Sequence, residues 1–184
     1  TQEATLYVGT YIARVTEQHR ELYKVIGEEG EVTAAVSGKF AYGAKDAIDY
    51  PVVGDFVMID RMDDTSGNAV IHRILRRKSV LPRQAAGTAS LPQPIAANID
   101  TIFICMSLNA DYNLRRVERY LAVAWDSMAT PVIVLTKADL CPDLEGKIAE
   151  LALSAPGVDI VPCSVHSGLG LDVIDRYLAP GQTV

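Results

Sequence analysis

The sequence lacks the features that mark several classes of protein. It has no run of about 18 apolar residues, so no membrane-spanning helix is expected, and it opens without the basic-then-apolar pattern of a secretory signal. Its three cysteines, Cys105, Cys141 and Cys163, are far apart and make no C-x-x-C pair. Neither a disulfide framework nor a metal site is therefore expected, and a reducing cytoplasm fits the composition.

Excess positive charge is also missing. The 184 residues carry a net charge of −6, with a pI of about 5.0. Residues 11–82 hold 10 basic and 11 acidic side chains, and residues 99–184 hold 6 and 11. A role with nucleic acid would therefore need a local patch instead of a global field. One basic cluster without an intervening acid gives the candidate RNA contacts, namely Arg73, Arg76, Arg77, Lys78 and Arg83.

The first part of the chain predicts a small β-barrel. Residues 1–10 are expected to be a lead-in, and residues 11–82 contain about five short apolar segments with turn signals every 8–12 residues. Five strands favour an OB-type barrel, whose exposed face commonly holds single-stranded nucleic acid. A barrel that binds only protein, or only a neighbouring domain, is an alternative that the composition leaves open.

The composition then changes twice. Residues 83–98 are rich in Ala, Gly, Ser, Thr and Pro without periodicity, which predicts a linker or mobile loop and a domain boundary. Residues 99–184 alternate apolar strand patterns with amphipathic helices, in the order βαβαβα. Such an order predicts a parallel sheet with helices on its faces. Three arginines lie off the apolar stripe of the first helix, where a solvated face is the favoured interpretation: Arg115, Arg116 and Arg119.

A polar motif follows the second of these strands. Residues 132–135 are a buried strand pattern, and Thr136, Lys137 and Asp139 then spell the form [NT]-K-x-D. Ligands of open α/β sheets bind at this end of the strands. An Asp there can accept hydrogen bonds from the ring N–H and the amine of guanine, while the Lys stem covers the base. The alternative is a strand that ends in a turn with both side chains solvated.

A second strand end supports the guanine interpretation. Residues 158–163 predict a short strand, and Ser164 and Val165 follow it directly. The Ser would brace the loop, and a backbone N–H near Val165 would meet guanine O6. Two motifs in this order, each at a strand end, are typical of the base-recognition loops of GTP-binding domains.

The phosphate loop of such domains is absent from the sequence. No G-x-x-x-x-G-K-[ST] motif occurs, although its backbone N–H groups and hydroxyl normally hold the phosphates and Mg²⁺. Asp143 to Gly146 spells D-x-x-G, but it opens a helix, so we interpret it as chance. A β-barrel occupies the place where the phosphate loop usually precedes the [NT]-K-x-D motif. This order predicts circular permutation.

At this point the sequence resembles the ribosome small-subunit-dependent, circularly permuted GTPases of the RsgA/YjeQ type. The resemblance extends over about residues 11–184 and covers about the first half of a family member. Thr136 stands where most GTPases carry Asn, and Val165 stands where Ala is commoner. The matching stretches are Val36–Lys39, Val53–Asp55, Ile95–Asp100, Ser107–Asn109, Arg119–Leu121 and Pro131–Leu140.

The resemblance implies an OB-type barrel, then a partial, circularly permuted P-loop GTPase domain with a three-layer α/β fold. The intact parent would hydrolyse GTP with Mg²⁺ in biogenesis of the small (30S) ribosomal subunit, with its barrel on ribosomal RNA. Asp139 would select guanine, Lys137 would cover it, and Thr136 with Ser164 and Val165 would shape the loops. The catalytic groups and a zinc-binding tail would lie beyond residue 184, so the chain alone is expected to be inactive.

A second hypothesis needs no catalysis. The chain would be a non-enzymatic RNA- or ribosome-binding module, in which the barrel and the basic residues 73–83 hold RNA. The α/β half would then be a scaffold. Loss of salt-dependent RNA binding on removal of the basic cluster, with no effect of nucleotide, would favour this alternative.

Overall fold

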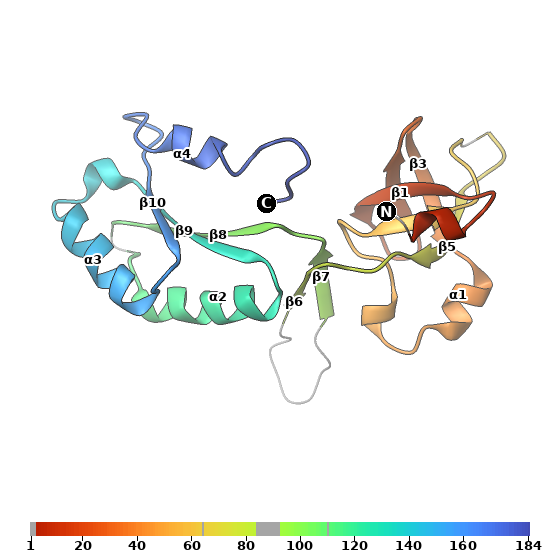
Figure 1. Cartoon of the computed structure of the whole chain (residues 1–184), viewed down its shortest axis with the longest axis horizontal. Helices are drawn as coiled ribbons and strands as arrows, with labels where there is room; N and C mark the ends of the chain where they lie inside the picture. Colours follow the sequence, from red (N-terminus) through yellow and green to blue (C-terminus); the bar gives the residue numbers. More distant parts are fainter. Residues whose placement is uncertain (1–2, 64, 84–92, 110) are drawn as a thin grey trace. The chain divides into compact units, whose positions relative to one another are not determined.

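A computed structural model describes residues 3–63, 65–83, 93–109 and 111–184 (Figure 1). The chain divides into two compact units, Thr1–Asn98 and Ile99–Val184. Within the part of the chain that is described, no helix is both long and apolar enough to cross a bilayer.

Five strands close into a barrel in the first unit, in the order β1-β2-β3-β5-β4 (Figure 1). Strands β3 and β5 are parallel, and the other neighbours are antiparallel. Side chains alternate as a half-buried strand requires: Ala13 and Val15 are buried in the core, and Arg14 between them faces outward. The predicted five-stranded barrel is confirmed. Its strands are β1 (Tyr11–Gln18), β2 (Tyr23–Gly27), β3 (Gly30–Val36), β4 (Phe56–Ile59) and β5 (Ala69–Ile74).

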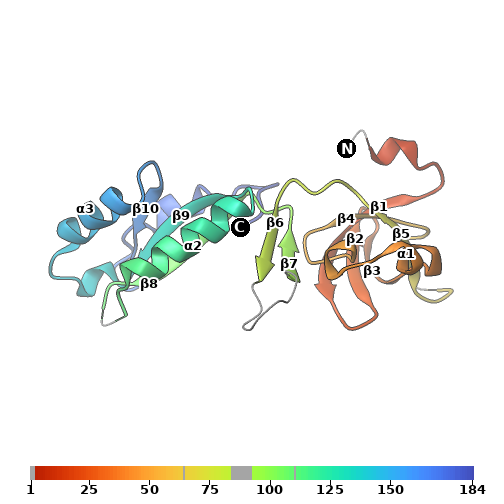
Figure 2. The same cartoon turned by 90° about the horizontal axis from the view of Figure 1, so that it is seen from below.

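Three short helical segments accompany the barrel and were not predicted. They are η1 (Ala4–Leu6), α1 (Gly38–Gly43) and η2 (Ala47–Asp49). The hydroxyl of Ser37 caps α1 by accepting a hydrogen bond from the N–H of Phe40 at 3.0 Å. The helix α1 lies outside the barrel, next to β5 (Figure 2). One or two turns are too short to give a helical periodicity in the sequence.

The segment expected to be a linker contains a strand instead. Residues 84–92 lie outside the described residues, but β7 (Gln93–Ala97) pairs antiparallel with β6 (Val80–Arg83). A parallel bridge from Ala96 to Val53 joins this hairpin to the turn before β4. Pro94 and the small residues nearby have the composition of a loop, so the sequence did not indicate a strand here. The boundary between the compact units follows Asn98.

The second unit is built on a parallel sheet in the order β10-β9-β8. Helices α2 and α3 cover one face of this sheet, and α4 covers the other (Figure 1). The central strand β9 is buried on both faces, as its continuous apolar run predicts. Its elements are β8 (Thr101–Ser107), α2 (Leu114–Asp126), β9 (Thr130–Thr136), η3 (Ala138–Leu140), α3 (Leu144–Ser154), β10 (Asp159–Pro162) and α4 (Leu171–Asp175).

Polar side chains cap the N-termini of α2 and α3. The Asn113 side chain accepts a hydrogen bond from the N–H of Arg116 at 3.0 Å, and α2 starts at the next residue. Asp143 does the same for α3, through the N–H of Gly146 at 3.0 Å. Asp143 to Gly146 is therefore a helix cap, and its D-x-x-G spelling has a structural cause.

Candidate functional site

Two loops lie side by side at the carboxyl edge of the parallel sheet. Because β9 and β10 are parallel neighbours, the residues that follow them emerge at the same edge. The N–H of Ala138 donates to the carbonyl oxygen of Cys163 at 3.1 Å. The N–H of Cys163 donates to the carbonyl oxygen of Leu135 at 2.8 Å. These two bonds join the segment containing Lys137 and Asp139 to the segment containing Ser164.

The first loop exposes its two charged residues. Lys137 has a left-handed backbone (φ +59°, ψ +39°) and stands immediately before the short helix η3. Asp139 lies in the first turn of η3, and both side chains are exposed. Across residues 3–63, 65–83, 93–109 and 111–184, neither the Asp139 carboxylate nor the Lys137 ammonium makes a direct hydrogen bond or ion pair. Both groups are available to a ligand.

The second loop is held together by Ser164. This residue is 2% exposed. Its N–H donates to the carbonyl oxygen of Leu169 at 3.0 Å, and its hydroxyl accepts from the N–H of Ser167 at 3.2 Å. Val165, next along the chain, is 87% exposed. The serine therefore fixes the loop, while the valine and its backbone face solvent.

A glycine closes this loop against β10. Gly170 has a φ of +69°, and a Cβ atom there would lie 2.1 Å from the carbonyl oxygen of Pro162. A side chain cannot fit without moving the backbone. Gly168 also has a positive φ, of +77°, but open space surrounds the position of its Cβ. Close packing thus demands glycine at residue 170 in particular.

The arrangement suits an aromatic base with donors on one edge. The Asp139 carboxylate offers only acceptors, and the loop at Val165 offers backbone donors, as an N–H and a carbonyl of guanine require. The sequence contains no G-x-x-x-x-G-K-[ST] motif. Among the described residues, no group of His, Cys, Asp and Glu could hold a metal ion. We therefore derive no hydrolytic step from these residues.

The end of β8 also lies at this edge of the sheet, although none of its residues is among the predicted guanine contacts. Ser107 pairs in register with Thr136, and the N–H of Leu108 donates to the Thr136 carbonyl oxygen at 3.0 Å. Near the start of α2, the Arg116 guanidinium donates two hydrogen bonds to the Asp111 carboxylate, at 3.1 and 2.9 Å. They lower the pKa of Asp111, and the nearby charge of Lys137 lowers it further. In the sequence, a polar Ser-x-Asn that follows an apolar strand was the signal that could have indicated this position.

A shallow hollow of this unit lies elsewhere. It has a volume of about 660 Å³ and lies on the outer side of α2, between Arg115, Glu118 and Arg119. None of the predicted guanine contacts lines it. All of its lining residues come from one helix and the residue that caps it, so we interpret the hollow as a furrow between long solvated side chains. Arg116, the third arginine of this face, pairs with Asp111 instead.

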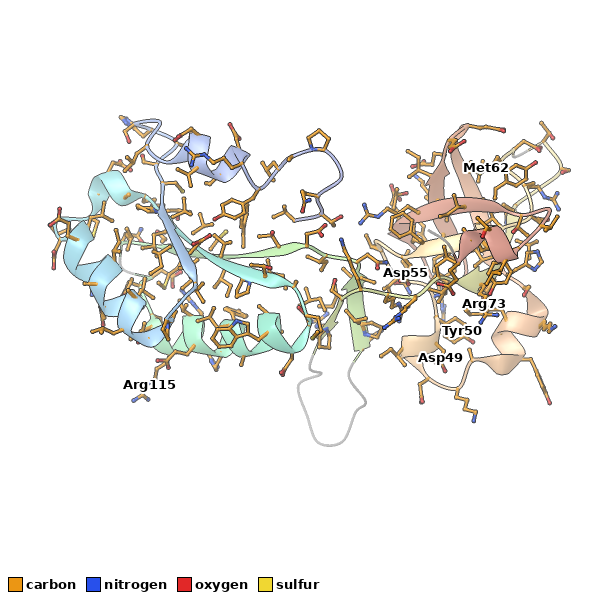
Figure 3. All side chains as sticks on the ribbon, in the orientation of Figure 1. Asp49, Tyr50, Asp55, Met62, Arg73 and Arg115 are labelled. Atoms are coloured by element: carbon orange, nitrogen blue, oxygen red, sulfur yellow. The ribbon has the colours of Figure 1, made fainter. Side chains whose placement is uncertain are left out.

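One member of the basic cluster has a structural role. The Arg77 guanidinium donates to the two Asp55 carboxylate oxygens at 2.8 and 2.7 Å, and to the carbonyl oxygens of Ile48 and Tyr50 at 2.6 and 2.8 Å. Asp55, labelled in Figure 3, is fully buried, and the Arg77 side chain is 14% exposed. Four donor contacts leave Arg77 little capacity for RNA. These contacts therefore favour a structural role for Arg77 over contact with RNA.

The other basic residues lie on the surface of the first unit. Arg73 projects from β5, Arg83 ends β6, and both are exposed, as are Arg76 and Lys78. The guanidinium of Arg73 lies over the ring of Tyr7, 5.4 Å from its centre. The N–H of Arg76 donates to the Glu3 carboxylate at 2.9 Å. The lead-in thus contacts two of the predicted RNA-binding residues.

Comparison with known proteins identifies the family. Residues 74–184, more than half of the chain, match the family model described as RsgA GTPase. The chain belongs to the RsgA GTPase family. The predicted family resemblance is confirmed.

Curated relatives agree with this assignment. A small ribosomal subunit biogenesis GTPase RsgA 2 of Lactiplantibacillus plantarum is 51% identical over 176 residues, which are 96% of this chain and 49% of that protein. The RsgA of Methanosarcina acetivorans is 41% identical over 97% of this chain and 47% of its own length. The chain spans about half the length of the curated relatives that it matches.

Solved structures support the fold of this RsgA family member. The crystal structure of YjeQ from Thermotoga maritima has a TM-score of 0.69 at 25% identity, over 92% of this chain and 57% of that one. YloQ, described as a circularly permuted GTPase, has a TM-score of 0.64 at 20% identity, over 91% of this chain and 55% of that one. The predicted fold class, a β-barrel followed by a permuted α/β domain, is confirmed.

Proposed function

We propose that residues 99–184 recognise the guanine base of a guanine nucleotide. Asp139 accepts from the ring N–H and amine of the base, and the stem of Lys137 lies on its face. Thr136 and Ser164 hold the two loops in position, and the backbone at Val165 donates to guanine O6. The contrast between guanine and adenine follows, because adenine lacks the paired donors that Asp139 needs.

One observation carries this proposal. The N–H of Ala138 and the carbonyl oxygen of Cys163 lie 3.1 Å apart, so two segments separated in the sequence share one edge of the sheet. The exposed carboxylate of Asp139 lies in the first of these segments. The exposed Val165 lies in the second. A turn that only ended a strand would not need a second loop hydrogen-bonded to it.

The whole protein, in this proposal, is a GTPase of small ribosomal subunit biogenesis that acts in the cytoplasm and uses Mg²⁺ with GTP or GDP. The family and the names of the relatives support that activity. The 184 residues alone hydrolyse no GTP, because they contain no phosphate loop. In the relatives, about half of the length has no counterpart here, and the phosphate-binding, catalytic and zinc-binding groups are assigned to that half.

Titration of the isotopically labelled chain with GMP and with AMP tests base recognition. We expect GMP to shift the backbone amide resonances of residues 136–140 and 163–168 and to leave the barrel unchanged, while AMP shifts neither set. Equal shifts with both nucleotides would refute guanine recognition. GTP turnover above an enzyme-free control would separately refute the assignment of catalysis to other residues.

A second function is favoured by the exposed basic residues of the barrel unit. We propose that Arg73, Arg76, Lys78 and Arg83 bind ribosomal RNA, whereas Arg77 is held by its contacts with Asp55. Binding of a small-subunit RNA fragment should weaken steeply with salt. Joint replacement of Arg76 and Lys78 by Ala should weaken it further, whereas replacement of Arg115 and Arg119 on α2 is the matched control. Equal loss in both pairs would contradict the assignment.

A further inference from the structure

We propose that Arg73 and the backbone N–H of Arg76 form a site for one nucleotide of single-stranded RNA, which residues 3–7 of the chain occupy in the absence of RNA. This inference rests on the RNA-binding part of the proposed function and adds to it a residue-level site. It also gives a role to the N-terminal segment, for which the sequence suggested none.

The first half of the site is a stacking surface. The Arg73 guanidinium is exposed on β5 and lies 5.4 Å from the centre of the Tyr7 ring. Unpaired bases stack on guanidinium groups in the same way, since every base has a π face. Tyr7 therefore occupies the position that the base of a bound nucleotide would take.

The second half of the site is an anion position. The N–H of Arg76 donates to a carboxylate oxygen of Glu3 at 2.9 Å. Backbone N–H groups are common donors to the phosphates of nucleic acids, and a phosphate oxygen is the same kind of acceptor as a carboxylate oxygen. Glu3 and Tyr7 are joined by the short helix η1. The segment therefore presents an anion and an aromatic ring on a short connection, as a nucleotide does.

The contacts of the segment are few enough for RNA to displace it. No residue of η1 is buried, Leu6 is 75% exposed and Val8 is 97% exposed. The barrel core begins with Ala13 and contains none of residues 3–10. A segment without core contacts opens at low cost in free energy. The surroundings favour RNA over an acidic protein segment as the competitor, because an Arg plane for stacking adjoins further basic residues along 76–78.

The test is binding of a fluorescent ten-nucleotide single-stranded RNA to the full 184-residue chain, followed by anisotropy at low salt. Glu3→Ala with Tyr7→Ala should raise the affinity about threefold to fivefold, the factor that an exposed cation–π contact provides. Arg73→Ala should lower the affinity about tenfold, as expected for the loss of one stacked base. Arg73→Ala in the doubly substituted chain should abolish the gain.

The opposite signs make this test specific. A substitution that only damaged the fold could lower affinity but not raise it. Tyr42→Ala is the matched control, because Tyr42 is another tyrosine of this unit and is 95% exposed on α1; it should leave binding unchanged. If RNA binds but neither Tyr7 nor Arg73 alters its affinity, this site is refuted and RNA binding stands. If no variant binds RNA at all, both proposals fail.

Discussion

Replacement of Arg77 by Ala should destabilise the barrel unit more than any other single removal of a basic side chain in it. Asp55 is fully buried, and its carboxylate receives two hydrogen bonds from Arg77 and one from the N–H of Val52 at 2.9 Å. Removal of the guanidinium leaves a buried carboxylate without its counter-charge. The carbonyl oxygens of Ile48 and Tyr50 lose a donor as well, but water can reach the half-exposed Ile48 segment.

The expected loss can be worked from this geometry. Breaking a buried ion pair by removing one partner costs about 3–5 kcal/mol. Because the Arg77 side chain keeps 14% of its exposure, we expect the lower end, about 3 kcal/mol. With a urea dependence of about 1.5 kcal/mol per M, typical of a small domain, the unfolding midpoint should fall by about 2 M.

Urea unfolding followed with two probes measures this effect. Far-UV circular dichroism reports both units, whereas fluorescence of Trp125, the single tryptophan, reports the unit that contains α2. Arg77→Ala should shift the barrel component of the dichroism and leave the Trp125 midpoint in place. The control is Arg61→Ala, because the pair of Arg61 with Asp60 is more exposed, at 31% and 26%, and its loss should cost much less stability. Equal losses in the two variants would refute the reasoning.

Three further predictions concern backbone space and ionisation. Gly54→Ala should cost about 2–4 kcal/mol, because φ is +90° and the new Cβ would lie 2.2 Å from a carbonyl oxygen of β7; Gly67→Ala, at φ +101° in open space, should cost about 1 kcal/mol by urea unfolding. Gly170→Ala should weaken GMP binding by displacing its loop from β10, whereas Gly168→Ala should change it less; the reverse order would contradict the packing argument. Burial, with a hydrogen bond to Glu150, raises the pKa of Tyr112 to about 12, so the folded state holds this proton longer than the unfolded state and stability should fall as pH rises from about 10 to about 12. Tyr112→Phe should remove that component of the alkaline loss, and an unchanged pH dependence would count against it.

The sequence predicted the regular parts of the fold because their patterns are local. Short apolar segments with regular turn signals indicated the barrel strands, and the alternation of strand and helix patterns indicated the order of the second unit. Strand β7 was missed because its pairing depends on β6, which ends ten residues before it, and on Val53, which lies far from it in the sequence. Its proline and small residues carry the composition of a loop.

The candidate site was predictable to a similar extent. Two motifs at strand ends identified residues 136–139 and 164–165, since parallel pairing brings such ends to one edge. The contribution of Asp111 near Lys137 depends on a turn that no periodicity indicates. The ion pair of Arg77 was not predicted because its partner, Asp55, precedes it by 22 residues, and a run of basic residues does not reveal which member is buried in an ion pair.

The most direct test of guanine recognition is a change of base preference at Asp139. In Asp139→Asn, the amide offers one acceptor and one donor, which match the ring N–H and the additional carbonyl of xanthine in place of the amine of guanine. Titration of the labelled chain should show GMP affinity falling at least about tenfold and XMP binding appearing at residues 136–140. Unchanged preference for GMP in the variant would contradict the account.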